Sequence, residues 1–314
     1  DGRRLPLVMI SCDRREGCYR TVALNDEIVR EIDRLGKPNA ASLCDLDHLW
    51  DPVEFEQWQS GLGAALLDDE ILDRLQVAGH GTLYLAPHPS VSHIPYEALM
   101  VAGVPLGATI PILRVPHRTT PARTVGQRTA VGYADPAVST LLEQREFPAS
   151  PMPASEFSQA IGPDQLIWVC AHGGAEIDLD NKITDSGGTL VLDAADILAR
   201  DLTGSSVLLE TCWSGRSFGQ THGEALSITT ALLLAGASEV VASLFPLPIS
   251  QSSTGLIAAS TLRWLQLGIP AQEALCQARR EYLNTASGSI QIAGADLELR
   301  SDAPLAWAGL VAFA

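Results

Sequence analysis

An apolar run of strand length stops abruptly at a thiol and two small residues in the stretch Val207-Leu208-Leu209-Glu210-Thr211-Cys212-Trp213-Ser214-Gly215. An earlier run of the same kind stops at an imidazole and two glycines, in Ile167-Trp168-Val169-Cys170-Ala171-His172-Gly173-Gly174. The carboxyl ends of parallel strands meet at one edge of an open α/β sheet, where such folds keep their sites. The two stretches therefore predict a parallel sheet with Cys212 and His172 at the same edge.

A thiol next to an imidazole points to a nucleophile and its base. A cysteine is a useful nucleophile at neutral pH when a base stands beside it. We therefore expect Cys212 to attack a carbonyl carbon and His172 to be the general acid and base. The N–H groups of Gly173, Gly174 and Cys212 are candidates for an oxyanion hole, because glycine lets the backbone approach a substrate closely. Each motif alone is more often a buried cysteine or an ordinary loop, so the prediction rests on the pair.

The remaining pattern indicates an α/β domain preceded by a short extension. Residues 1–50 read as a β-hairpin and a short helix, and residues 51–314 as the main domain. Helical spacing covers about 52–76, and strands then alternate with helices, as in a mainly parallel sheet. The Pro-, Ser- and Ala-rich stretch 135–162 is expected to be a mobile surface connection. Strands are expected near 82–86, 110–114, 129–133, 166–171, 205–211, 239–245 and 305–313, and helices near 223–235, 249–267 and 270–285.

Further segments, taken with the two strand ends, resemble the CHAT domain, a branch of the caspase, separase and metacaspase cysteine peptidases. The resemblance covers roughly residues 50–314 and follows the order of the family. Where the family often has a small residue before the cysteine and a Trp near Phe245, this chain differs, with Glu210-Thr211 before the cysteine. The segments that carry the resemblance are Leu83–Pro87, His93–Leu99, Gly132–Pro136, Gly223–Leu226, Leu234–Ala237, Val240–Phe245, Glu273–Arg279 and Pro304–Leu310.

The resemblance implies a caspase-like three-layer αβα sandwich with a mainly parallel sheet, here with the N-terminal hairpin as an extension. It implies a cysteine endopeptidase that cleaves a protein or peptide substrate through the dyad Cys212 and His172, without a cofactor. CHAT domains often act in bacterial signalling and defence, so a regulatory domain or activator protein is expected. The chain begins at Asp1, not Met, and we expect that partner to lie outside it.

Acidic residues near the dyad are candidates for a substrate pocket. Glu210 lies two residues before Cys212, so on a strand both side chains share one face. In metacaspases an acid at this position selects Arg or Lys in the substrate residue before the scissile bond, called P1. The alternative is an internal partner such as Arg216, because a buried Glu is rarely unpaired. Glu176 and Asp178, with Asp180, could line the pocket or orient His172, or form a solvated acidic loop.

Composition and residue spacing exclude several classes of function for this chain. A net charge of −16 argues against a nucleic-acid-binding surface, which is basic. Six scattered cysteines read as the reduced thiols of a cytoplasmic protein. The apolar stretch 225–242 is interrupted by Gly and Glu, so no membrane span is expected. The spacing of His80, His88 and His93 fits no metal site, so no metal is expected.

Three functions remain open at this point. The first is the peptidase, and the second is a catalytically silent scaffold that uses the same fold to bind partner proteins. The third is an α/β-hydrolase or thioesterase, whose nucleophile elbow needs a glycine two residues before the nucleophile, where this chain has Glu210. His222 is a fallback base.

Overall fold

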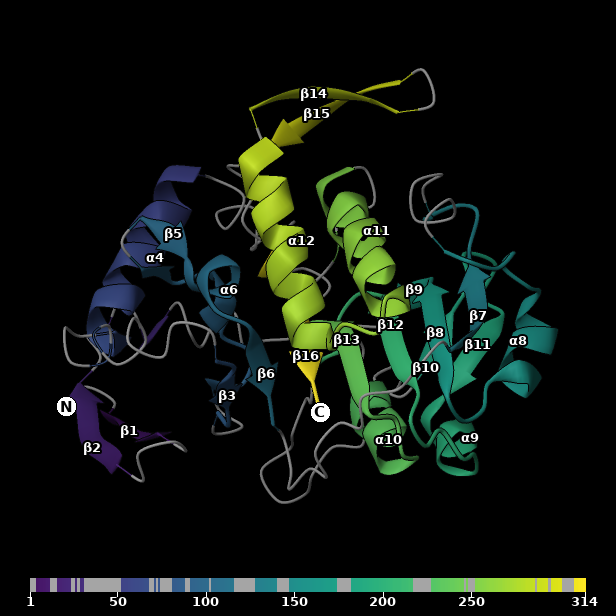
Figure 1. Cartoon of the computed structure of the whole chain (residues 1–314), viewed down its shortest axis with the longest axis horizontal. Coiled ribbons are helices and arrows are strands. Elements are labelled where there is room, and N and C mark those ends of the chain that lie inside the picture. The colour runs from purple at the N-terminus through teal and green to yellow at the C-terminus, as the bar shows by residue number, and fades with distance from the viewer. Residues whose placement is uncertain are drawn as a thin grey trace.

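The structure is a computed structural model of the chain (Figure 1). It describes residues 4–11, 16–23, 26, 29–30, 52–67, 71, 73, 81–87, 91–101, 103–115, 128–139, 147–173, 182–216, 227–245, 247, 252–285, 287–292, 295–300 and 308–314.

A seven-stranded sheet forms the centre of the molecule, in the order β3-β6-β16-β13-β12-β8-β7. All neighbouring pairs in it are parallel except β13 with β16, where two parallel groups of strands meet in opposite directions. The sequence prediction of a mainly parallel sheet is therefore confirmed. The strands are β3 (Leu83–Leu85), β6 (Ile112–Arg114), β7 (Thr129–Ala134), β8 (Gln165–Cys170), β12 (Ser206–Glu210), β13 (Glu239–Ser243) and β16 (Leu310–Phe313).

Both faces of this sheet are covered. Every residue of β12, β13 and β16 is buried, which requires packing layers above and below the strands. Helices α11 (Ser252–Gln266) and α12 (Ala271–Thr285) lie side by side over the sheet, and α10 (Ile228–Leu234) packs against β13 (Figure 1). The expected α/β sandwich is confirmed.

Shorter elements complete the core around the sheet. Helix α8 packs against β7, and α12 packs against α6. Arg114, the last residue of β6, and Glu97, in the turn η2, form a buried pair joined by two hydrogen bonds of 2.9 and 2.6 Å. These elements are α4 (Pro52–Leu66), η2 (Tyr96–Ala98), β4 (Met100–Val101), β5 (Val104–Pro105), α6 (Leu106–Thr109), α8 (Ala154–Ala160) and α9 (Ala194–Leu198).

Two hairpins lie outside the central sheet. The expected N-terminal hairpin is present as β1 (Arg4–Ser11) and β2 (Glu16–Ala23), paired antiparallel. A second hairpin, which the sequence analysis did not predict, joins β14 (Ser287–Ile292) and β15 (Ala295–Arg300). It extends beyond the end of α12 (Figure 1).

The prediction of a mobile surface connection over 135–162 is wrong for residues 147–162. This part carries helix α8, and Phe147 and Phe157 are both buried in the core. The Phe147 ring lies 5.1 Å from the Trp168 ring between centroids. It also occupies the space beside Gly132, where an added Cβ would stand 2.4 Å from a ring carbon. Two buried aromatic rings thus bind the segment to β7 and β8, although its composition is that of a loop.

A small three-stranded sheet lies at the carboxyl end of β8. Its strands are β9 (His172–Gly173), β10 (Lys182–Thr184) and β11 (Leu190–Asp193), and both neighbouring pairs are antiparallel. In it, Thr184 is opposite His172 and Ile183 is opposite Gly173. The sequence analysis expected only a loop after His172. The small sheet instead holds the imidazole in a strand.

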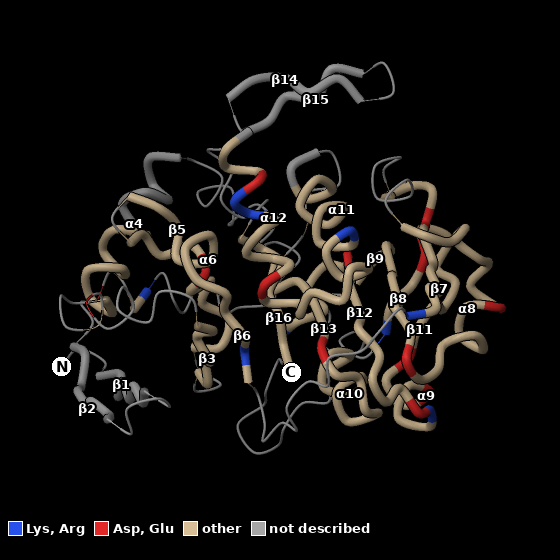
Figure 2. The backbone as a smooth tube through the Cα atoms, viewed as in Figure 1, with Lys and Arg blue, Asp and Glu red and all other residues tan. Residues whose placement is uncertain are grey.

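Charge is spread over the described elements and does not gather on one of them. Figure 2 shows acidic residues in α8 and α9, a basic residue in α11 and residues of both signs in α12, among long uncharged segments. No helix in the described part of the chain is long and apolar enough to cross a membrane.

Candidate active site

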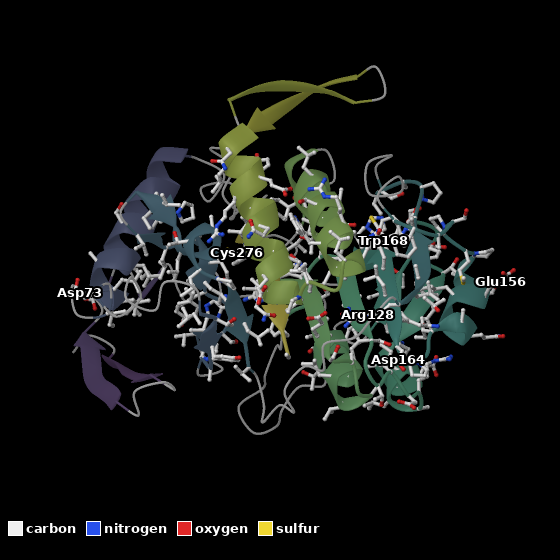
Figure 3. The ribbon with its side chains drawn as sticks, in the orientation of Figure 1. Asp73, Arg128, Glu156, Asp164, Trp168 and Cys276 are labelled. Carbon is white, nitrogen blue, oxygen red and sulfur yellow. The ribbon has the colours of Figure 1, made fainter. Side chains whose placement is uncertain are left out.

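The carboxyl ends of β8 and β12 bring the predicted dyad together. These strands are parallel neighbours, with Glu210 opposite Cys170. The Ala171 N–H extends the ladder to the Glu210 carbonyl at 3.4 Å. His172 and Cys212 each lie two residues beyond the last pair, so they follow adjacent strands at one sheet edge. Figure 3 shows Trp168 towards this end of β8, and Asp164 at the opposite end.

Gly173 lies directly against the backbone of Cys212. A Cβ added to Gly173 would stand 1.9 Å from the Cys212 carbonyl oxygen and 2.9 Å from its carbonyl carbon. Real Cβ atoms do not approach so closely, so only glycine fits here. This contact shows that the His-Gly segment crosses over the turn that holds the thiol.

The turn after β12 is held firmly against β13. The Gly215 N–H donates to the Ser243 carbonyl at 2.8 Å, and the Ser243 N–H donates to the Ser214 hydroxyl at 3.1 Å. Trp213, next to the thiol, has a φ of 62°. A bulky residue rarely adopts this left-handed conformation, which costs of order 1–3 kcal/mol. The surrounding hydrogen bonds offset that strain and hold Cys212 at the start of the turn.

The thiol of Cys212 is covered by Leu247. The Leu247 N–H donates to Cys212 Sγ at 3.3 Å. Burial raises the pKa of this thiol, and the N–H groups of Leu247 and of Cys212 itself only partly oppose that effect. In this conformation the thiol is therefore protonated at neutral pH, and the nucleophile is not activated.

Asp135, which the sequence analysis did not single out as a site residue, faces His172. It follows β7, the neighbour of β8, and its Oδ2 lies 4.0 Å from His172 Nε2. The Asp135 side chain is 3% exposed and that of His172 is 39% exposed. The sequence alone carries one signal for Asp135, a carboxylate directly after an apolar strand. The order of the strands, which places β7 beside β8, was needed to use it.

The Asp135 carboxylate is held ionised by its neighbours. Burial acts to raise its pKa, but hydrogen bonds from the Ala137 N–H and from the N–H and hydroxyl of Ser186 act against this. These bonds are 2.9, 2.5 and 3.1 Å long. Together with the nearby His172 they outweigh burial, so the pKa of Asp135 lies below its ordinary value.

Glu210 has an internal hydrogen-bond partner in Trp168. The side chain is buried, and its Oε2 accepts a hydrogen bond from Trp168 Nε1 at 2.6 Å. The Arg216 guanidinium lies over the Trp213 ring, 4.7 Å from the ring centroid. A carboxylate has room for several donors, so the bond to Trp168 leaves the pocket prediction open.

The structure does not describe most of the other residues that the sequence analysis considered. Gly174, Glu176, Asp178, Asp180 and His222 lie outside the described residues, as do His80 and His88. His93 is buried just before η2. Among the described residues, no group of three or more His, Cys, Asp or Glu side chains could hold a metal ion.

Comparison with known proteins identifies a family whose model matches this chain. The family model of the CHAT domain matches residues 137–314, which is more than half of the chain and includes His172 and Cys212. No curated protein matches the sequence. Among solved structures, a chain of the separase–securin complex of Saccharomyces cerevisiae is similar, with 13% sequence identity and a TM-score of 0.45. The similarity covers 74% of this chain but only 15% of that one.

Proposed function

Because this chain belongs to the CHAT domain family, we propose that it is a cysteine endopeptidase with Cys212 as nucleophile and His172 as general acid and base. The observation that carries the proposal is the close contact of Gly173 with the Cys212 backbone, since it joins the imidazole-bearing strand to the turn with the thiol. On this proposal residues 51–314 are the peptidase domain and 1–50 its extension. We expect it to act in the cytoplasm, in bacterial signalling or defence.

The reaction that we propose uses the two side chains in turn. His172 takes the proton of the thiol, and the Cys212 sulfur forms a bond to the scissile carbonyl carbon. The N–H groups of Cys212 and Gly173, with Gly174, stabilise the oxyanion. When the C–N bond breaks, His172 gives its proton to the leaving amine. Water, deprotonated by His172, then hydrolyses the thioester and frees Cys212.

The covered thiol implies that the peptidase is latent. Cys212 is partly exposed, but the Leu247 backbone that is hydrogen-bonded to its Sγ occupies part of the space beside the thiol. Activation must therefore displace the segment around Leu247, and lifting the cover also lowers the pKa of the thiol by exposing it to water. We propose that a regulatory domain or activator protein drives this step, as loop ordering does in other gated enzymes.

The same observation supports the second candidate, a silent scaffold that binds partner proteins. A buried, protonated thiol that no activator uncovers would be a structural residue. The two candidates differ in whether any condition exposes Cys212 to a substrate.

The test is covalent labelling with peptidyl acyloxymethyl ketones that present different P1 residues. Trypsin cleaves after Arg200 and Arg216 and releases a peptide of residues 201–216, in which Cys212 is the sole cysteine, so mass spectrometry reads the site directly. The peptidase proposal expects modification at Cys212 that is absent from His172→Ala. A wild-type protein that resists every probe, also with cell extract added as a source of activator, would favour the scaffold.

A further inference from the structure

We infer that Asp135 is a positioning residue for His172, which fixes the imidazole with its proton on Nε2 and stabilises the imidazolium that forms during the reaction. This inference rests on the proposed peptidase function.

The backbone fixes where the Asp135 carboxylate stands. The Asp135 N–H donates to the Cys170 carbonyl at 2.8 Å, which continues the ladder between β7 and β8 by one residue. His172 follows two residues after Cys170. Asp135 is therefore anchored to the strand that carries the imidazole, and its Oδ2 faces His172 Nε2 at 4.0 Å.

That distance suits an ion pair and is longer than a hydrogen bond. Catalytic hydrogen bonds are often long in the absence of substrate and shorten in the complex. Here the Leu247 N–H is hydrogen-bonded to the thiol and no substrate is bound, so the proposed function treats this as the resting conformation. We expect the Asp135 contact to shorten when the imidazole gains a proton.

The hairpin formed by β10 and β11 holds both partners of this pair. Its turn supplies the Ser186 N–H and hydroxyl, which donate to the two oxygens of the Asp135 carboxylate. Its strand β10 pairs with β9, where Thr184 is opposite His172. One hairpin therefore keeps the carboxylate ionised and aligns the imidazole next to it.

The chemical consequence concerns which ring nitrogen is protonated. A carboxylate facing Nε2 keeps the proton there, and Nδ1 is then the nitrogen that accepts the thiol proton. The resulting imidazolium carries a positive charge between the Cys212 thiolate and Asp135. Asp135 keeps its own charge throughout and takes no proton, as in other Asp–His pairs that serve a nucleophile.

The experiment compares wild type with Asp135→Asn, Asp135→Glu and Asp185→Asn. Asp185 is the matched control, because it is an acid in the same hairpin turn whose Oδ1 accepts from the Thr189 N–H at 2.7 Å and is not paired with His172 in the structure. One readout is the rate of Cys212 labelling by a peptidyl ketone, separated into binding and inactivation steps. The other is the ¹⁵N NMR signal of His172, assigned against His172→Ala, at a pH where the imidazole is neutral.

We expect Asp135→Asn to slow the inactivation step by about 10²–10⁴-fold with little change in probe binding. Its His172 signal should show Nδ1–H in place of Nε2–H. Asp135→Glu should keep Nε2–H and recover part of the rate, and Asp185→Asn should behave as wild type. The Glu variant keeps the test decisive if the Asn variant unfolds, since loss of Nε2–H in Asp135→Glu contradicts the inference.

The inference and the proposed function fail in different ways. If wild type is labelled at Cys212 and Asp135→Asn matches it in rate and tautomer, the role of Asp135 is overturned while the peptidase stands. If wild type is not labelled even with cell extract added as a source of activator, the peptidase proposal fails, and the NMR comparison alone decides whether Asp135 positions His172.

Discussion

The backbone N–H of Leu247 donates a hydrogen bond of 3.3 Å to Cys212 Sγ, although 35 residues separate them along the chain. The donor belongs to the segment just after β13, so the cover and the nucleophile follow adjacent strands of the sheet. Because this contact lies at the thiol itself, we expect it to affect how Cys212 reacts before any activator is present.

Cys212 should react slowly with iodoacetamide in the native protein. Burial raises the pKa of its thiol, so little thiolate is present at neutral pH and the rate should keep rising above the ordinary thiol pKa of about 8.5. The measurement is the extent of alkylation of the tryptic peptide 201–216 against time and pH. The same protein in denaturant is the control, and a native Cys212 that alkylates as fast as the unfolded one at neutral pH would contradict the covered state.

Gly173→Ala should disrupt the site. Its Cβ would collide with the Cys212 carbonyl oxygen at 1.9 Å, so either the His172 strand or the thiol turn must shift. A displacement of about 1 Å near reacting groups can cost about 10²-fold in rate. Gly162→Ala is the matched control, because the nearest atom to its added Cβ is 3.9 Å away. Probe labelling and the melting temperature report the result; equal labelling of both variants would show that the contact with Cys212 is unimportant.

Removing either dyad side chain should abolish cleavage without unfolding the chain. Cys212→Ala and His172→Ala should each lower turnover by several orders of magnitude, as for other nucleophile–base pairs. His172 is 39% exposed, so its loss leaves no large cavity. Cys276→Ala is the control, since this cysteine is buried in α12 away from the site. Peptide turnover and circular dichroism are the measurements, and appreciable turnover by either dyad variant refutes the assignment.

The parts of the fold that the sequence predicted share one physical cause. Strands such as β8 and β12 are buried on both faces, which demands a continuous apolar run, and such a run is visible without knowledge of the partner strands. Their ends were equally visible, because His172 and Cys212 interrupt the runs. The hairpin of β14 and β15 also left a signal, an alternation of apolar and polar residues in Leu297-Glu298-Leu299-Arg300, that the sequence analysis did not use.

The contacts that the sequence did not predict depend on which strands are neighbours. Asp135 gains a role only because β7 lies beside β8, and Leu247 covers Cys212 only because β13 lies beside β12. The two-residue strand β9 is too short to show any periodicity. Helix α8 was not predicted either. The burial of Phe157 against the rest of the fold determines its place, and its own sequence pattern does not show this.

The last prediction concerns specificity, and it depends on the carboxylate of Glu210. If Glu210 binds the P1 side chain, ketone probes with Arg at P1 should label Cys212 more than tenfold faster than those with Leu or Asp. A guanidinium bound to a desolvated carboxylate gains charge-assisted hydrogen bonds worth about 1.5–3 kcal/mol each, which corresponds to at least that discrimination. Salt should weaken the preference only slightly, because a buried pair is poorly screened.

Two substitutions separate this role of Glu210 from a structural one. Glu210→Gln removes the charge and should lower the preference for Arg to a small factor. Trp168→Phe removes the indole N–H that now occupies Glu210 Oε2 at 2.6 Å but keeps the carboxylate, so the preference for Arg should persist or increase. Labelling rates with P1 Arg, Leu and Asp probes on each variant are the measurement. If Leu is preferred by wild type, or if Glu210→Gln keeps an unchanged preference for Arg, then Glu210 does not bind the P1 side chain and the substrate pocket lies elsewhere.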